Sequence, residues 1–519
     1  MPKRFLLILF FIDCFICSVA KTISPYDYGL REATNGEERY WAIYNTHLEA
    51  IKQNATVNYS GIKQLSIEIP ENARRIPLSE ETDFCGLRLL VSNTKRKDFT
   101  LFYYEKEVSE IEVSKECFTT YSFDEYPELK TDCVLLIVED SNPWVENRIG
   151  FNYGATRRDI LLLKNGRAVN RTISPYDNDS SLPRCYYVRT TEKKKFFKNI
   201  ELVRTESSTM KTFLLNAKNI NNLEISGIII KTPYRDDWYA DAIITVEGCT
   251  NLSMCDIKID NTYSQKNQFG YAFALGNIWN ATISKVTAVA EWGVFGCSNI
   301  NKATLTDCYI NRFDLHCYGK DYYFRNCTIL DEIPISSMFG EMKFEKCTFE
   351  TAYPCEYRYD YNAYTPFNII FNRCTFKMDK KHNFIVFISK LSDERNSRKE
   401  LHLKCLPNIC IKKSVIELDE DVDKLDIIHV GENLYKSSLG YITSIEIRDL
   451  TLRGAETNVN LVTNNVETLF PVNVTIKRFK YKGRATPSLK INLNYYNPAN
   501  TRLKASRLNF NIDEELHGN

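Results

Sequence analysis

The chain has 519 residues and a formal net charge of +1, from 67 basic and 66 acidic side chains. This balance argues against nucleic acid as a partner, because proteins that bind it concentrate positive charge. After the first twenty residues no stretch approaches about 18 consecutive apolar residues, so no integral membrane segment is expected. No Pro/Gly/Ser-rich linker divides this long chain, which favours an elongated repeat over several compact domains.

The first twenty residues have the organisation of a secretory signal peptide. A positive start at Lys3 and Arg4 precedes the apolar stretch 5–12, and the small residues 18–20 match a cleavage site. Cleavage near Ala20 would remove two basic residues and one acidic residue, which leaves 65 of each sign. We therefore expect a protein that is secreted, periplasmic or located at the cell surface.

The segment 21–66 is predicted to form an N-terminal cap with a short helix. The stretch from Arg39 to Asn54 carries apolar residues at helical spacing and ends at an asparagine. Further on, short strand-like pieces alternate with polar turns; they lie at 65–70, 87–91, 133–138 and 160–163. We interpret 67–200 as irregular first coils of a larger repeat, interrupted by an insertion.

From Asn219 onward one sequence motif recurs: an apolar-x-apolar strand, two or three polar residues, then a cysteine or small apolar residue and another short strand. Its second apolar position serves as a marker, at Ile225, Met254, Ile283, Leu305, Phe324, Phe344, Phe371, Ile411, Ile447 and Ile476. The shortest intervals between successive markers are near 20 residues, and longer intervals contain insertions. A stack of three-stranded β-coils produces this pattern. Leucine-rich repeats are the main alternative, but their Leu/Asn signature is missing.

This pattern predicts an all-β fold, a parallel β-helix over 67–482 with a C-terminal cap and tail at 483–519. Right-handedness follows from the usual chirality of parallel strand connections. An open β-helix exposes unpaired strand edges and apolar core at its ends, so a covering helix is needed, and the N-terminal cap supplies one.

At its N-terminus the sequence resembles the pectate-lyase-like superfamily of tailspikes and polysaccharide-degrading enzymes. Tyr26-Asp27-Tyr28-Gly29, the helix containing Ala42-Ile43 and the strand Ile67-Glu68-Ile69-Pro70 follow the order in which such proteins commonly open. The resemblance implies a right-handed parallel β-helix and a polysaccharide partner. Glu37-Glu38 replace the usual paired aspartates, and neither the Gly-His-Gly nor the Arg-rich family signature is present, so no particular substrate is implied.

Fifteen of the 17 cysteines remain after cleavage, and their odd number excludes a complete disulfide framework. Many follow an apolar-x-x-Cys pattern, which suggests small buried hydrophobic residues. Four lie three residues after their markers and are predicted to form a ladder of buried free thiols: Cys308, Cys327, Cys347 and Cys374.

A candidate site follows from four glycines that close strands in consecutive coils, at Gly276, Gly296, Gly319 and Gly340. Aligning the coils on these glycines places Trp292 inward. The same alignment puts four polar residues on one exposed outer face, and we assign them as catalytic: Glu291, Arg312, Asp314 and His316. Neighbouring coils lie about 4.8 Å apart. Repulsion between two carboxylates at that distance would raise the pKa of one of them and favour the protonated form that a general acid needs.

Aromatic and polar neighbours complete this candidate site. We assign six residues to substrate binding: Tyr271, Phe295, Tyr318, Lys320, Asp321 and Tyr361. Aromatic faces suit the C–H surfaces of sugars. The alternatives are a solvated charge ladder for Arg312, Asp314 and His316, ordinary turn residues at 320–321, and a tyrosine-rich loop at 357–364 that only covers core.

No cofactor and no metal site are assigned. The acidic residues Asp236, Asp237 and Asp241 could bind calcium, but contiguous acids in a loop are more often plain turn residues.

The sequence therefore predicts an exported, carbohydrate-active β-helix protein. A hydrolase would use Glu291 and Asp314 as acid and as base or nucleophile. A lyase would use His316 or a nearby tyrosine as base, with Arg312 neutralising a uronate carboxylate. The alternative is a non-catalytic glycan-binding adhesin or a structural envelope protein, because fold alone does not imply enzymology.

Overall fold

The structure is a computed structural model of the whole chain. It describes residues 21–78, 81–145, 155–173, 182–205, 211–232, 242–261, 271–290, 292–336, 338–350, 354–358, 367–381, 383–388, 405–430, 441–442, 444–454, 457–463, 473–482, 489–490 and 509–512. The predicted signal peptide, residues 1–20, lies outside this part of the chain. So does the calcium candidate at residues 236–241.

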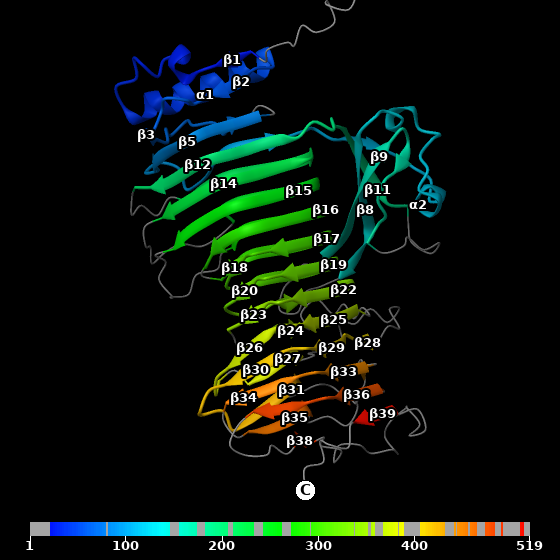
Figure 1. Cartoon of the computed structure of the whole chain (residues 1–519). Coiled ribbons are helices and arrows are strands. Elements are labelled where there is room, and N and C mark those ends of the chain that lie inside the picture. Colours follow the sequence, from blue (N-terminus) through cyan, green and yellow to red (C-terminus); the bar gives the residue numbers. More distant parts are fainter. Residues whose placement is uncertain are drawn as a thin grey trace, which may run out of the picture.

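Parallel strands stack coil upon coil along the long axis of the molecule (Figure 1). The upper coils use long strands: β5 (Glu81–Ser92), β6 (Asp98–Glu105), β12 (Lys195–Arg204), β13 (Lys211–Asn221), β14 (Leu223–Thr232), β15 (Ile244–Asn261), β16 (Tyr271–Ala288), β17 (Gly293–Thr306) and β19 (Phe313–Arg325). Asparagines with left-handed backbone bend these strands at the coil corners, for example Asn219 and Asn299 (φ 58° and 57°).

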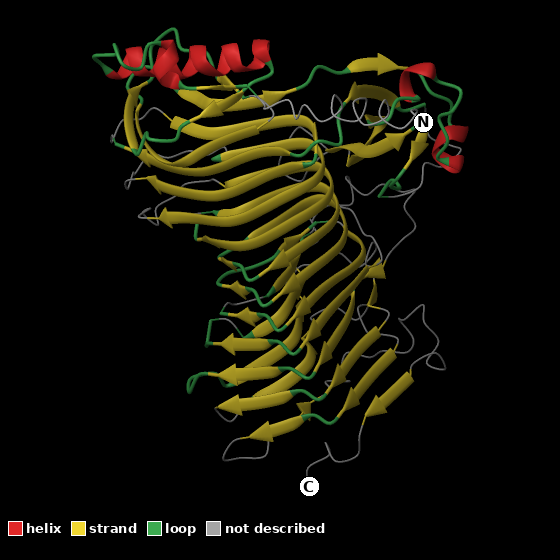
Figure 2. Ribbon diagram, turned by 45° about the horizontal axis from the view of Figure 1, so that its top comes forward, coloured by secondary structure: helices red, strands yellow, loops and turns green. Residues whose placement is uncertain are grey.

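In the lower coils each turn of the β-helix is built from separate short strands (Figure 2). One row contains β22 (Met338–Glu345), β25 (Phe367–Asn372), β29 (Asn408–Lys412), β33 (Ser444–Arg448) and β36 (Asn473–Lys477). A second contains β18 (Tyr309–Ile310), β20 (Thr328–Ile329), β23 (Thr348–Phe349), β26 (Thr375–Met378), β30 (Val415–Leu418), β34 (Thr451–Gly454) and β37 (Lys480–Lys482). The third contains β21 (Pro334–Ile335), β24 (Cys355–Tyr357), β27 (Phe384–Ile388), β31 (Lys424–Val430) and β35 (Asn458–Thr463).

The marker residues of the repeat form one inward column, which confirms the predicted phase. From Ile225 to Phe371 each marker is the in-register partner of the next, and all seven are buried. The aromatic members stack: the rings of Phe324 and Phe344 lie 4.8 Å apart, and those of Phe344 and Phe371 lie 5.1 Å apart. The apolar phase of the repeat therefore determines the core.

The predicted thiol ladder lies beside this column. Cys308, Cys327, Cys347 and Cys374 are buried and free, which confirms that prediction. Contact with Cys327, together with burial, raises the pKa of the Cys308 thiol well above its usual value. The four thiols therefore act as small core residues.

One helix, α1 (Gly36–Gln53), lies across the open end of the first coil (Figure 1). It begins three residues before the predicted start, because the Asn35 side chain accepts a hydrogen bond from the Glu38 N–H at 2.9 Å and caps the helix. It ends where Asn54 adopts the left-handed conformation (φ 48°). The strands β1 (Thr22–Ile23), β2 (Thr56–Asn58), β3 (Gln64–Glu68) and β4 (Ile76–Pro77) join it to the first coils.

An antiparallel sheet interrupts the segment 67–200. Its strands are β7 (Ser109–Ile111), β8 (Val134–Val145), β9 (Ala155–Lys164), β10 (Arg167–Ala168) and β11 (Arg184–Arg189), accompanied by α2 (Glu116–Thr120). One face packs on the flank of the β-helix at Trp279. The sheet projects sideways from the upper coils (Figure 1).

The coils continue past residue 482, where the sequence places the start of the C-terminal cap. There β38 (Leu489–Lys490) pairs with β35, and β39 (Asn509–Ile512) pairs with β36. Among the helices in the described ranges, none has both the length and the apolar character needed to cross a membrane.

Candidate functional site

Asp314 lies on β19 in the same row as Gly296 of β17 and Ala274 of β16, its in-register neighbours. Residues of this row alternate with the buried positions Phe295 and Leu315, so the row faces outward. The alignment on glycines is therefore wrong: Gly276 pairs with Ser298, not with Gly296.

The glycines do not share one place in the coil because each makes room for a different neighbour. A Cβ at Gly296 would meet the Tyr271 ring at 2.6 Å, whereas a Cβ at Gly276 would collide with the Glu247 carboxyl. The recurrence of glycine therefore reflects local steric crowding, and it does not define a common register between the strands.

His316 occupies a β-bulge. The register passes from Cys297 opposite Leu315 to Ser298 opposite Cys317, so His316 is the extra residue of β19. Bulges re-aim side chains and are frequent beside active sites. The bulge turns the imidazole toward Tyr271, whose Oη lies 2.9 Å from His316 Nε2.

Tyr271 connects three side chains at the centre of the site. Its hydroxyl donates a short hydrogen bond to Asp314 Oδ2 and accepts one from Trp292 Nε1 at 2.9 Å. Because the single hydroxyl proton is directed to Asp314, the contact with His316 requires Nε2–H as the donor. Burial raises the pKa of Tyr271 well above its usual value, and the neighbouring Asp314 charge raises it further, so the phenol is protonated at neutral pH.

Arg312 holds the other side of Asp314. Its Nε donates to Asp314 Oδ1 at 2.6 Å, and its Nη1 makes a short contact with the Glu332 carboxylate. The guanidinium also lies over the Trp292 ring, 4.4 Å from the centroid. We call these six residues the Asp314 cluster: Tyr271, Trp292, Arg312, Asp314, His316 and Glu332.

The cluster covers its own central carboxylate. The Asp314 side chain is 0% exposed, whereas that of His316 is 21% exposed. Burial alone would raise the pKa of Asp314, but hydrogen bonding to His316 and Arg312, together with the positive charge of Arg312, outweighs it and holds the pKa below its usual range. Asp314 is therefore an ionised, covered carboxylate, and His316 is a more accessible group.

Other predicted site residues differ from expectation. Phe295 was placed on the outer face but is fully buried, stacked on Phe273 with ring centroids 5.0 Å apart. Trp292 was placed inward but lies on the outer side, bonded to Tyr271 and Asp314. Both corrections have one cause, since the true register differs from the glycine alignment.

The remaining predicted residues lie apart from the cluster or outside the described residues. Asp321 is an exposed corner residue (φ 55°) whose carboxylate accepts from the Glu341 N–H at 3.2 Å, as a turn residue does. Lys320 beside it is half-buried. Glu291, Tyr361 and the side chain of Tyr318 lie outside the described part of the chain.

Solved structures share this architecture. The tailspike gp61 of Pseudomonas phage phi297 matches the chain with a TM-score of 0.54 at 12% sequence identity, over 91% of this chain and 82% of that one. The chain therefore has the right-handed parallel β-helix fold of this tailspike. Tailspike gp49 of Pseudomonas phage LKA1 matches with a TM-score of 0.47 at 12% identity, over 90% of this chain and 83% of that one.

A further match is the gp54 tailspike of Acinetobacter baumannii bacteriophage AP22, solved in complex with a capsular saccharide. Its TM-score is 0.47 at 13% identity, over 85% of this chain and 77% of that one. No protein-family model and no curated protein matches this sequence.

Sequence reasoning missed Glu332 and misplaced Trp292. Glu332 lies one coil below Arg312, and no spacing rule connects the two residues. Trp292 did carry a signal, because a coil of about 20 residues has little interior room for an indole ring. Within the described ranges no group of three or more His, Cys, Asp or Glu side chains converges as a metal site would require.

Proposed function

We propose that this chain is an exported carbohydrate-active protein that cleaves an acidic polysaccharide by β-elimination at the Asp314 cluster. The observation that carries the proposal is the 2.9 Å contact between Tyr271 Oη and His316 Nε2, with Tyr271 held by Asp314. An elimination needs one group to remove a proton and another to supply one. The β-helix superfamily of tailspikes and polysaccharide-degrading enzymes agrees with such a substrate.

The proposed step assigns one role to each residue of the pair. Neutral His316, which donates Nε2–H to Tyr271, uses Nδ1 to remove the proton next to the uronate carboxylate. The electron pair forms the new C=C bond, and the glycosidic C–O bond breaks. The Tyr271 hydroxyl turns from Asp314 and gives its proton to the leaving oxygen, and the imidazolium then passes its Nε2 proton to the phenolate. The positive charge formed on His316 offsets the negative charge that develops on the carboxylate.

Arg312 has a positioning role in this scheme. Its guanidinium is bonded to Asp314 and Glu332 and stacked on Trp292, so its charge is already balanced within the cluster. It orients Asp314, which in turn orients Tyr271. In this scheme Arg312 does not neutralise the substrate carboxylate, which differs from the role that the sequence suggests for it.

The hydrolase alternative has less support. Hydrolysis requires two carboxyl groups that face the scissile bond, one of them protonated. The Asp314 carboxylate is fully covered, and its pKa lies below its usual range. It is therefore a poor general acid and an inaccessible nucleophile.

A non-catalytic glycan-binding protein is the second candidate. The observation that favours it is that the polar groups of the cluster hydrogen-bond to one another. Asp314 is bonded to Tyr271, Trp292 and Arg312 and has no exposed surface. In this case the exposed parts of Trp292 and His316 would contact a sugar without reaction.

One experiment separates these functions. The mature chain from Lys21 is incubated with a panel of acidic and neutral polysaccharides, while the ultraviolet absorbance of unsaturated uronates and the number of new reducing ends are followed. We expect both to increase with an acidic polymer and Tyr271→Phe to remove the increase. New reducing ends without absorbance would indicate hydrolysis, and retention of polymer without either signal would indicate the binding protein.

His429→Asn provides a matched control for His316→Asn. His429 also contacts an aspartate, with Nδ1 2.9 Å from Asp426 Oδ2, but it lies on β31 in a lower coil. The proposal expects loss of turnover only for the change at His316. Equal loss in both variants would contradict it.

A further inference from the structure

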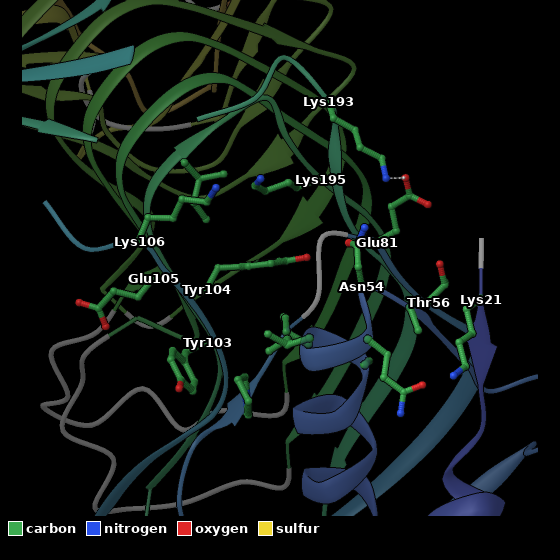
Figure 3. Close-up of a pocket in the computed structure, with 17 residues that line it drawn as sticks. Lys21, Asn54, Thr56, Glu81, Tyr103, Tyr104, Glu105, Lys106, Lys193 and Lys195 are labelled. Carbon is green, nitrogen blue, oxygen red and sulfur yellow. Dashed lines mark ion pairs between the residues drawn. The ribbon is translucent and has the colours of Figure 1, made fainter. Parts of the chain in front are cut away.

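A cavity of about 780 Å³ lies where the end of α1 meets the first coils, away from the Asp314 cluster (Figure 3). Its walls come from the cap, including Asn54 and Thr56, and from the coils, including Tyr103 and Tyr104. None of the cluster residues lines it. Its volume lies within the range of pockets that hold small organic ligands.

Among the described residues that line the cavity, basic side chains outnumber acidic ones. Four lysines face two glutamates there: Lys21, Lys106, Lys193 and Lys195 against Glu81 and Glu105. One ion pair joins a lining lysine to a lining carboxylate, between Lys193 Nζ and Glu81 Oε1 at 3.0 Å (Figure 3). Lys21 and Lys106 form no ion pair within the described part of the chain. The excess of cations would attract an anionic ligand.

The backbone holds these lysines in place. Lys21 precedes β1, and its carbonyl accepts from the Thr56 N–H at 2.8 Å. Lys195 begins β12, and its N–H donates to the Asn222 carbonyl at 2.8 Å. Lys195 is only 1% exposed and is engaged within the protein, so it forms part of the wall, and Lys21 and Lys106 are the cations available to a ligand.

Removal of the leader would add to this charge. If cleavage occurs near Ala20, as the sequence predicts, the new α-ammonium group belongs to Lys21 at the edge of the cavity. The pairing of β1 with β2 keeps that terminus beside the cap. Processing would therefore complete the positive wall.

Two tyrosines give the cavity a second property. Tyr103 and Tyr104 follow one another near the end of β6, and both line it. Tyr104 is 7% exposed and belongs to the core, so the half-buried Tyr103 ring, over which Arg75 lies at 5.3 Å, is the phenol that can contact a sugar. Lysines beside aromatic rings match a sugar that carries carboxylates.

We propose that this cavity is a second, non-catalytic binding site for an oligosaccharide that carries carboxylate groups. It would anchor an acidic polymer at the capped end of the β-helix while the Asp314 cluster acts on another part. The inference rests on the proposed function for the kind of sugar. The lysine-lined cavity itself is independent of that function.

The test measures binding of tetragalacturonate to the mature chain by calorimetry, with neutral cellotetraose as the comparison sugar. We expect tetragalacturonate to bind, with an affinity that falls as salt is added, and cellotetraose not to bind. The double variant Lys21→Gln/Lys106→Gln should bind at least tenfold more weakly, because two cations are lost. All proteins are first compared by circular dichroism and thermal unfolding.

Lys380→Gln/Lys381→Gln is the matched control, since it removes the same charge from an exposed turn of a lower coil. Equal weakening in the two double variants, or equal binding of the neutral sugar, would overturn the inference. Binding that depends on Lys21 and Lys106, in a protein without turnover and without retention of polymer at the Asp314 cluster, would support the cavity and contradict the proposed function. Turnover of polymer without this binding of tetragalacturonate would support the proposed function and contradict the cavity as a binding site.

Discussion

The ring of Tyr271 lies against the backbone of Gly296, where any Cβ would come within 2.6 Å of a ring carbon. The two residues belong to adjacent coils, and this close approach lets the Tyr271 hydroxyl reach Asp314 on the next coil. The missing side chain at 296 is therefore a requirement of the Asp314 cluster.

Gly296→Ala should displace Tyr271 and disrupt its contacts with Asp314 and His316. We expect a loss of about 1–3 kcal/mol in the free energy of unfolding from overpacking, and loss of function at the cluster. Chemical denaturation and the polysaccharide assay measure these effects. In the Tyr271→Ala background the added methyl group has room, so the stability cost of Gly296→Ala should largely disappear. Additive costs would contradict the proposed contact.

Asp314→Asn should destabilise the fold as well as impair the site. From an exposed position the sequence would predict little loss of stability, but Asp314 is fully buried and bonded to Arg312. Removing one charge of a buried pair costs about 3–5 kcal/mol. Asp321→Asn, at an exposed corner, should stay within about 0.5 kcal/mol of the parent protein. Similar unfolding curves for both variants would argue against a buried Asp314.

Phe324→Ala tests the core column. The ring is fully buried between neighbouring coils and stacks on Phe344. We expect the free energy of unfolding to fall by about 3–5 kcal/mol, because the truncation leaves a cavity. Tyr309→Ala, at a side chain with 43% exposure, serves as the control and should change stability little. Comparable losses would show that the column does not carry the core.

The four ladder cysteines should titrate as free thiols in protein that has been unfolded without a reductant. In the folded protein they should react slowly with alkylating agents, because they are buried. Mass spectrometry after differential alkylation measures both states. A disulfide between any two of Cys308, Cys327, Cys347 and Cys374 would refute the ladder.

The cap should lose stability in acid because of His47. Burial lowers the pKa of this imidazole to about 3, against about 6.5 in an unfolded chain. The folded state therefore binds fewer protons than the unfolded state. The contribution of His47 to the free energy of unfolding is complete above about pH 6.5 and is lost as the pH falls toward 3. Each unit of difference corresponds to about 1.4 kcal/mol.

Unfolding curves between pH 7 and pH 4 measure this effect. His47 Nε2 lies 2.8 Å from the Tyr59 hydroxyl, so the comparison variant is His47→Phe/Tyr59→Phe, which leaves neither polar group unpaired. It should show a shallower dependence on pH over this window. Parallel curves for the two proteins would exclude His47 as the source.

The sequence by itself determined the β-helix, the inward column and the thiol ladder. These features depend on which residue types recur at one phase of a coil, and that phase is local information. A buried position in a stacked strand selects apolar residues such as Ile225 or Phe371 wherever the coil lies, so the pattern is visible without coordinates.

Only the tertiary structure decided the site. Arg312, Asp314 and His316 are close in sequence, but their partners Tyr271, Trp292 and Glu332 come from other coils. The register that joins them depends on a bulge at His316 and on the space above Gly296. A bulge of one residue changes which side chains meet, and its energy comes from contacts between strands, which no single strand encodes.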